Sequence, residues 1–190
     1  MIKIKKLLLY IGIGIVSIPV FIAAYYFIAW GPNETDPTLS KNPVYKSFDK
    51  QKNKTVFEEE SEGGQSNNLI IKTDNDTSEE SYTCYIDENN LFLDIKFSAG
   101  DGFSGGGYEL KIVKNRHQLS PYHYTDVIRP FDFLDTGDYY KVLDSRLVLD
   151  KDSYKKGDTI FGYTAFKIQN RYGPEKYFEE GKGYFKAIVN

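Results

Sequence analysis

The stretch GDGFSGGG, at residues 100–107, matches two short patterns that carry chemistry in many proteins. Starting at Gly100, it fits G-x-G-x-x-G, the glycine pattern of loops that bind phosphate groups. Around Ser104, it fits G-x-S-x-G, the pattern of the nucleophile elbow in serine hydrolases. Both patterns work only where a strand leads into the glycines and a helix follows them. The elements on either side of this stretch therefore decide between the two chemistries.

The segments on both sides of the glycine stretch alternate between apolar and polar residues. Residues 91–97 read LFLDIKF and residues 108–114 read YELKIVK, which is typical of half-buried antiparallel strands. Because a second strand follows the glycines, the helix N-terminus that would hold a pyrophosphate is missing, and the nucleophile elbow also lacks its helix. We therefore predict that the chain binds no nucleotide and is not an enzyme.

The two histidines, His117 and His123, are the residues on which any catalytic or metal-binding hypothesis depends. With Ser104 and Asp126 they supply the residue types of a catalytic triad, but a triad is recognised by its geometry and not by its composition. With Asp126 or Asp132 they match no metal-ligand spacing. We predict no catalytic residue, no metal site and no cofactor, and we expect both histidines to be polar loop residues that bind nothing. A small serine hydrolase remains the least favoured function.

We interpret residues 100–107 as a glycine-rich hairpin loop, since glycine adopts positive φ values without strain. Phe103 lies near the tip of this loop, where an apolar side chain either packs back onto the domain or inserts into the pocket of a partner. A second irregular region, residues 115–138, is longer than most loops and contains several aromatic residues. The candidate binding residues from the two regions are Phe103, Ser104, Tyr122, His123, Tyr124 and Arg129.

Residues 7–30 carry no charged side chain and predict a membrane-spanning helix. At about 1.5 Å per residue this segment reaches about 36 Å, which exceeds the ~30 Å hydrocarbon core of a bilayer. The apolar region of a signal peptide is shorter and ends in small residues, whereas this one ends in aromatic residues such as Trp30. We therefore favour an uncleaved anchor, and the pair Ala23 and Ala24 leaves cleavage as the alternative.

The charges on either side of the apolar run predict its orientation. Three lysines lie within residues 1–6, and the first charged residues after the run are Glu34 and Asp36. The positive-inside rule then leaves residues 1–6 in the cytoplasm and residues 31–190 on the periplasmic or extracellular side of the inner (cytoplasmic) membrane. The exported part has 21 basic and 27 acidic residues, which argues against nucleic acid as its partner.

After the apolar run, the chain divides into a polar segment and a strand-rich segment. Residues 31–68 are polar and contain three prolines, so we predict a stalk with a short ordered piece at VYKSF. Residues 69–190 predict a mainly β domain, an antiparallel β-sandwich, with a barrel as the less favoured alternative. The predicted strands are residues 68–72, 81–86, 91–97, 108–114, 139–143, 146–150, 158–168 and 183–189.

The only cysteine, Cys84, lies in the predicted strand SYTCYI on the same face as Tyr82 and Ile86. A free cysteine in such a position is usually a small buried residue, and this is the outcome that we expect. An intermolecular disulfide is the alternative for a single exported thiol.

The stretch LVLDKDSYKKGDTIFGYTAF is similar to a D-K-x-x-Y-x-x-G-D-x-I run found in macroglobulin-like and other immunoglobulin-like exported domains. This resemblance covers about 20 residues and implies an exported immunoglobulin-like β-sandwich, without implying an activity. The matching residues are Asp150, Lys151, Tyr154, Gly157, Asp158 and Ile160.

Together these features predict a non-catalytic protein-binding module that is anchored in the membrane and faces away from the cytoplasm. Its 13 tyrosines outside the apolar run exceed what one small core can satisfy, so several are expected at the surface, where tyrosine suits protein contact. One concrete form is an immunity-type protein that captures an incoming toxin. The alternative is a structural or accessory subunit of a cell-envelope complex. Residues 7–30 are expected to contact the lipid bilayer.

Overall fold

The structure is a computed structural model that describes residues 2–48, 66–74, 82–88, 92–100, 103–125, 139–172 and 175–189. It divides into two compact units, Met1–Gly31 and Pro32–Asn190.

The first unit is a single apolar helix, α1 (Ile2–Ala29). Its segment Tyr10–Ala29 has a mean hydropathy of 2.2 and no buried residues, so the helix is long and apolar enough to cross a membrane. Near its end, the rings of Tyr26 and Trp30 lie 5.4 Å apart. Aromatic residues in this position suit the interface between lipid and water. The predicted N-terminal apolar helix is confirmed.

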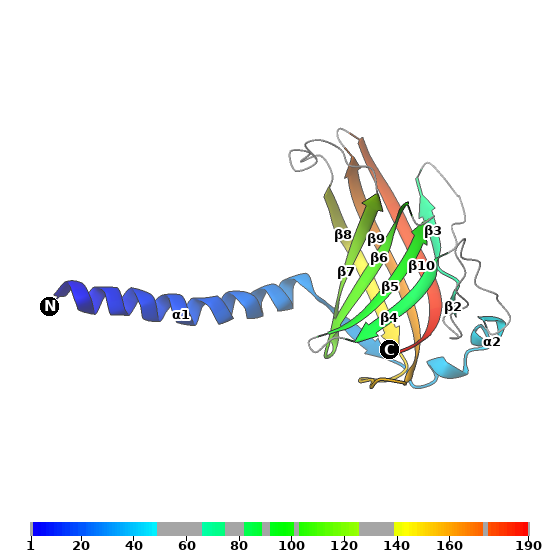
Figure 1. The fold of residues 1–190 in the computed structure, drawn as a ribbon, viewed down its shortest axis with the longest axis horizontal. Coiled ribbons are helices and arrows are strands. Elements are labelled where there is room, and N and C mark those ends of the chain that lie inside the picture. Colours follow the sequence, from blue (N-terminus) through cyan, green and yellow to red (C-terminus); the bar gives the residue numbers. More distant parts are fainter. Residues whose placement is uncertain are drawn as a thin grey trace. The chain divides into compact units, whose positions relative to one another are not determined.

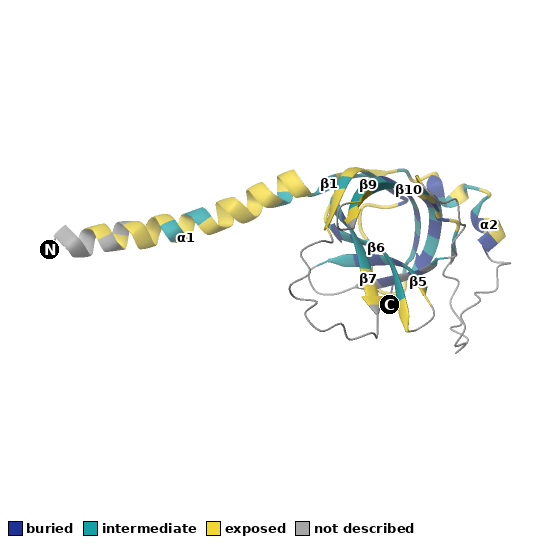
Figure 2. Cartoon of the chain, turned by 90° about the horizontal axis from the view of Figure 1, so that it is seen from above, coloured by how far each residue is buried: buried dark blue, intermediate teal, exposed yellow. Residues whose placement is uncertain are grey.

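In the second unit, the described residues form one sheet of ten strands (Figure 1). The order across the sheet is β2-β10-β9-β8-β1-β7-β6-β5-β4, and β3 also pairs with β10. The long strands run antiparallel to their long neighbours, whereas the short strand β1 runs parallel to β8. The sheet curves around a common interior (Figure 2). Strand β4, at one end of the sheet, contacts β10 near the other end. The strands are β1 (Gly31–Thr35), β2 (Ser66–Asn67), β3 (Ile70–Thr73), β4 (Thr83–Glu88), β5 (Leu93–Gly100), β6 (Ser104–Val113), β7 (Arg116–Thr125), β8 (Tyr139–Leu149), β9 (Thr159–Tyr172) and β10 (Glu175–Ile188).

The predicted mainly β domain is confirmed, but the immunoglobulin-like sandwich is not shown. All the strands belong to one mixed sheet that curves like a half-barrel, instead of to two stacked sheets. An alternating sequence reports only that one face of a strand is buried, so it fits both architectures. The curvature depends on glycines of the inner face. A Cβ at Gly162 would lie 2.0 Å from Cζ of Phe185, and one at Gly181 would lie 2.2 Å from Cζ of Phe166. The two glycines thus leave room for the rings as the sheet bends.

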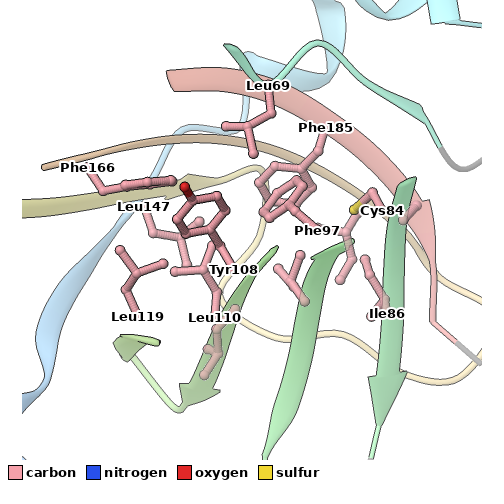
Figure 3. Close-up of a cluster of buried hydrophobic side chains, with 14 of the residues drawn as sticks. Leu69, Cys84, Ile86, Phe97, Tyr108, Leu110, Leu119, Leu147, Phe166 and Phe185 are labelled. Atoms are coloured by element: carbon pink, nitrogen blue, oxygen red, sulfur yellow. The ribbon is translucent and has the colours of Figure 1, made fainter. Parts of the chain in front are cut away.

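The inner face of the curved sheet forms the main core (Figure 3). Phe97 of β5 and Phe185 of β10 lie edge to face with ring centroids 5.4 Å apart, so side chains from opposite parts of the sheet touch. Tyr108 of β6 and Phe166 of β9 make a similar contact at 4.7 Å. Each such side chain contributes about 1.5–3 kcal/mol when it is buried. Cys84 is fully buried in the same core, as predicted, and its burial leaves no exposed thiol for an intermolecular disulfide.

Residues 32–48 belong to the sheet unit, although the sequence predicts a polar stalk over residues 31–68. Strand β1, at the start of this segment, lies between β7 and β8. Its sequence GPNET has no apolar alternation, so the local pattern does not indicate that the sheet takes it up. The second compact unit begins at Pro32, whereas the sequence predicts a domain that begins at residue 69.

Two short helices follow β1, namely η1 (Leu39–Lys41) and α2 (Tyr45–Phe48). They cover part of the outer face of the sheet, where Tyr45 is buried with Val148 in a second apolar cluster. The Tyr45 hydroxyl donates a hydrogen bond of 3.0 Å to the carbonyl oxygen of Gly162. Helix α2 coincides with VYKSF, so the ordered piece that the sequence predicts there is confirmed.

Candidate functional site

The glycine stretch lies in a β-hairpin, but less of it is a loop than the sequence predicts. Strand β5 ends at Gly100 and β6 begins at Ser104, so only residues 101–103 lie between the two strands. Residues 105–107, all glycine, are strand residues that pair with residues 122–124 of β7. Strands on both sides can hydrogen-bond the glycine backbone, and this pairing outweighs the conformational freedom of glycine.

Five of the six predicted binding residues come together at one end of β6 and β7. Residues 115–125 of the second predicted irregular region are mostly strand, and this brings the aromatic residues of β7 beside the hairpin end. Phe103 is 64% exposed and Tyr124 is 38% exposed. Arg129 lies outside the described residues. We call the group the aromatic tip, and its members are Phe103, Ser104, Tyr122, His123 and Tyr124.

The ring of Tyr124 lies across the backbone of two glycines. A Cβ at Gly100 or at Gly105 would lie 2.6 Å from the Tyr124 hydroxyl oxygen. Tyr122 lies two residues earlier, on the same face of β7, and pairs with Gly107. The glycines thus form a strip of bare backbone beside two tyrosines. Such a surface offers apolar ring area and hydroxyl groups together, which suits contact with a protein.

Gly107→Ala is expected to destabilise the sheet unit by about 2–3 kcal/mol. The new Cβ would lie 1.8 Å from the carbonyl oxygen of Phe97, a backbone atom that cannot move away without disturbing the β5–β6 pairing. Urea denaturation followed by circular dichroism measures the change. Ser104→Ala, at the exposed start of the same strand, is the matched control and should change stability by less than about 0.5 kcal/mol. Equal unfolding free energies for the two variants would show that the strand accepts a side chain at this position.

The described residues do not assemble the catalytic group that residue types suggest. Strand β6 contains the last three glycines and continues to Val113, so neither glycine pattern is followed by the helix that its chemistry needs. His123 is exposed at the aromatic tip near Ser104, whereas His117 is buried further along β7. Within the described ranges, no three His, Cys, Asp or Glu side chains are grouped to hold a metal ion. Asp126 and Asp132 lie outside those ranges.

His117 is not the loop residue that the sequence predicts, because it is a fully buried residue of β7. Its Nδ1 lies 2.8 Å from Oδ1 of Asn33 in β1, and its Nε2 lies 3.0 Å from Oγ of Ser145 in β8. With the proton on Nδ1, the ring donates to Asn33 and accepts from the Ser145 hydroxyl. Burial lowers the pKa of His117 to about 4, so the ring is neutral at pH 7. His117 thus joins three strands, including the first strand after the apolar helix.

The residues that resemble immunoglobulin-like domains form a closed turn between β8 and β9. Tyr154 donates its hydroxyl proton to Oδ1 of Asp150 at 2.7 Å, and the same oxygen accepts the backbone N–H of Phe161 at 3.0 Å. Gly157 has a φ of 87°, which glycine adopts without strain, and its N–H donates to the carbonyl oxygen of Val189. These contacts give the run a structural role, which is to hold the turn and the C-terminal strand together.

Comparisons with protein-family models, curated proteins and solved structures found no match for this chain. The resemblance of residues 150–160 to macroglobulin-like domains therefore stays a prediction, and the functional argument depends on the geometry of the surface.

Proposed function

We propose that this chain is a non-catalytic, membrane-anchored module that faces away from the cytoplasm and binds a protein partner through its aromatic tip. The observation that carries the proposal is the exposure of Phe103, 64%, at the turn between β5 and β6. Tyr122 and Tyr124 lie at the same end of the sheet, beside the strip of bare backbone. Exposed aromatic residues on a rigid scaffold are the residues that most often dominate protein interfaces.

The apolar segment Tyr10–Ala29 of α1 supports the anchored part of the proposal. The lysines before it and the acidic residues after it indicate that the N-terminus is cytoplasmic and that the sheet unit is periplasmic or extracellular. We place the anchor in the inner (cytoplasmic) membrane. The excess of acidic residues in residues 31–190, 27 against 21 basic, favours a partner with a basic surface.

Two kinds of binding module fit these features. The first is an immunity-type protein that captures an incoming toxin at the outer surface of the membrane. The second is a structural or accessory subunit of an envelope complex. The second receives support from Leu143, which lies outside the aromatic tip and is 43% exposed. Several contact surfaces on one small domain suit a subunit that has several neighbours.

Phe103→Ala is expected to weaken partner binding by at least about tenfold, because truncation of an aromatic residue in an interface pocket costs more than about 1.4 kcal/mol. The full chain, tagged and solubilised from membranes, is used to capture partners from an envelope extract, and affinity for the captured protein is then measured by biolayer interferometry. Ile70→Ala is the matched control, since it removes an exposed apolar side chain from β3, away from the aromatic tip. Its affinity should equal that of the unchanged chain.

The outcomes separate the candidate functions. A single stoichiometric partner that binds the unchanged chain but not the Phe103→Ala variant supports the immunity-type module. Several membrane subunits that co-purify with both variants support the accessory subunit. If the chain hydrolyses an ester substrate and Ser104→Ala abolishes this activity, the result would support the serine hydrolase. A single partner that binds the Phe103→Ala variant as tightly as the unchanged chain would contradict the role of the aromatic tip.

A further inference from the structure

We propose that a pocket at the other end of the sheet binds a single-chain anionic amphiphile, of the fatty-acid class, that comes from the adjacent membrane. The pocket has a volume of about 400 Å³ and lies where the β6–β7 turn meets the β8–β9 turn. It is at the Val113 end of β6, whereas the aromatic tip is at the Ser104 end. Sites for small molecules commonly have volumes of about 300–1,000 Å³.

The floor of the pocket is apolar and continues into the main core. Leu93, Ile112 and Leu149 line it, and Ile112 and Leu149 are buried core residues. The ring of Tyr154, which packs against the same core, adds a wall. Transfer of an alkyl chain from water to this floor is favourable in proportion to the apolar area that it covers. The floor therefore selects a ligand with an apolar portion.

The rim of the pocket carries a positive charge from each of the two turns. Lys114 comes from the β6–β7 turn and Lys151 from the β8–β9 turn. The one acidic residue of the lining, Asp152, accepts a hydrogen bond from the Thr35 hydroxyl. Lys151 lies 4.0 Å from Asp158, at the limit of an ion pair. No described carboxylate lies within ion-pair distance of Lys114. A carboxylate head group above the apolar floor would meet this lysine.

Lys114 lies in the two-residue turn between β6 and β7, a kind of turn that requires a positive φ. Its φ is 54°, and within the described ranges it is the one residue other than glycine with a positive φ. Glycine or asparagine occupies this conformation with less strain than lysine does. A lysine in this turn position is thus consistent with a requirement for its charge.

We take the membrane as the source of the ligand, because residues of the pocket wall closely follow the apolar helix along the chain. Asn33 lines the pocket and follows Ala29, the last residue of α1, by four residues. This step depends on the proposed anchoring of α1 in the membrane, and it does not depend on the aromatic tip or its partner.

The test is titration calorimetry of the full chain in phosphatidylcholine nanodiscs, with the heat of empty nanodiscs subtracted. Three probes separate the features of the ligand, namely decanoate, its neutral analogue decanamide, and inorganic phosphate. Lys114→Asn removes the charge and keeps a residue that suits the turn, and urea denaturation should show that its stability is unchanged or raised. Lys141→Asn, on β8 away from the pocket lining, is the matched control.

Decanoate is expected to bind at one site per chain, decanamide at least about tenfold more weakly, and phosphate not detectably. Lys114→Asn should weaken decanoate binding by about tenfold and leave decanamide unaffected, whereas Lys141→Asn should bind decanoate normally. The proposal is overturned if decanoate gives no saturable heat or if decanamide binds equally well. Phosphate binding as tight as decanoate binding would indicate a site for a free anion and would also overturn it. So would a Lys114→Asn variant that keeps full decanoate affinity.

Discussion

Lowering the pH from 7 to 4 is expected to destabilise the sheet unit by about 3 kcal/mol through His117. Burial among neutral partners lowers the pKa of His117 from an ordinary value of 6.5 to about 4. Between these two values, the unfolded chain binds a proton at His117 that the folded chain does not bind. The unfolded state is therefore favoured as the pH falls below about 6.5, and the loss is nearly complete at pH 4.

Urea denaturation at a series of pH values between 7 and 4 measures this effect. His117→Gln is the control, because it keeps a polar side chain between Asn33 and Ser145 but cannot titrate in this range. Hydrogen bonds from Arg146 and Lys167 hold the pKa of Glu34 and of Glu180 below the ordinary value, so these exposed carboxylates stay ionised until lower pH. The interval from pH 6.5 to 5 therefore isolates the histidine. The same pH dependence in both proteins would mean that His117 is not held neutral.

Phe185→Ala is expected to destabilise the sheet unit by about 3–5 kcal/mol, the largest effect of any single substitution that we predict. Phe185 is fully buried and meets Phe97 across the interior, so its removal leaves a cavity where the two parts of the sheet touch. The neighbouring residues cannot readily fill this cavity, because Gly162 lies against the ring and has no side chain that could move into the space. The free energy of unfolding, from urea denaturation at pH 7, measures the change.

Phe178→Ala is the matched control for this prediction. Phe178 lies on the same strand but is only half-buried, and its ring lies 5.5 Å from the ammonium group of Lys167. Its truncation should lower stability by about 1 kcal/mol or less, since cation–π contacts at exposed sites contribute about that amount. If both substitutions have the same effect, the contact between Phe97 and Phe185 does not hold the curved sheet together.

The local sequence predicted which segments are strands, but it did not predict where the strands end or which of them are continuous. The predicted strand at residues 158–168 corresponds to β9, which continues to Tyr172. The strands predicted at residues 139–143 and 146–150 are one strand, β8, with a change of register between Val142 and Asp144. A break in alternation indicates a strand end as readily as a bulge, because both shift the side chains from one face to the other.

The candidate site was predicted in part. Phe103 was found because it lies in a glycine run, and Tyr124 because it lies in a long region rich in aromatic residues. The β6–β7 register explains why they share one end of the sheet. His117 and Lys114 were missed. The burial of His117 depends on Asn33 and Ser145, which are 84 and 28 residues away along the chain. Lys114 lines a pocket whose other wall comes from the β8–β9 turn, and this arrangement leaves no local signal in the sequence.

The sequence by itself determined an apolar N-terminal helix and a mainly β domain, because hydropathy and alternation act within a few residues of chain. Only the tertiary structure decided that GPNET becomes strand β1, that the strands form one curved sheet, and that the glycine stretch is mostly strand. It also decided which residues meet at the aromatic tip and at the pocket. These features depend on pairing and packing between segments far apart in the chain, and so no local pattern could specify them.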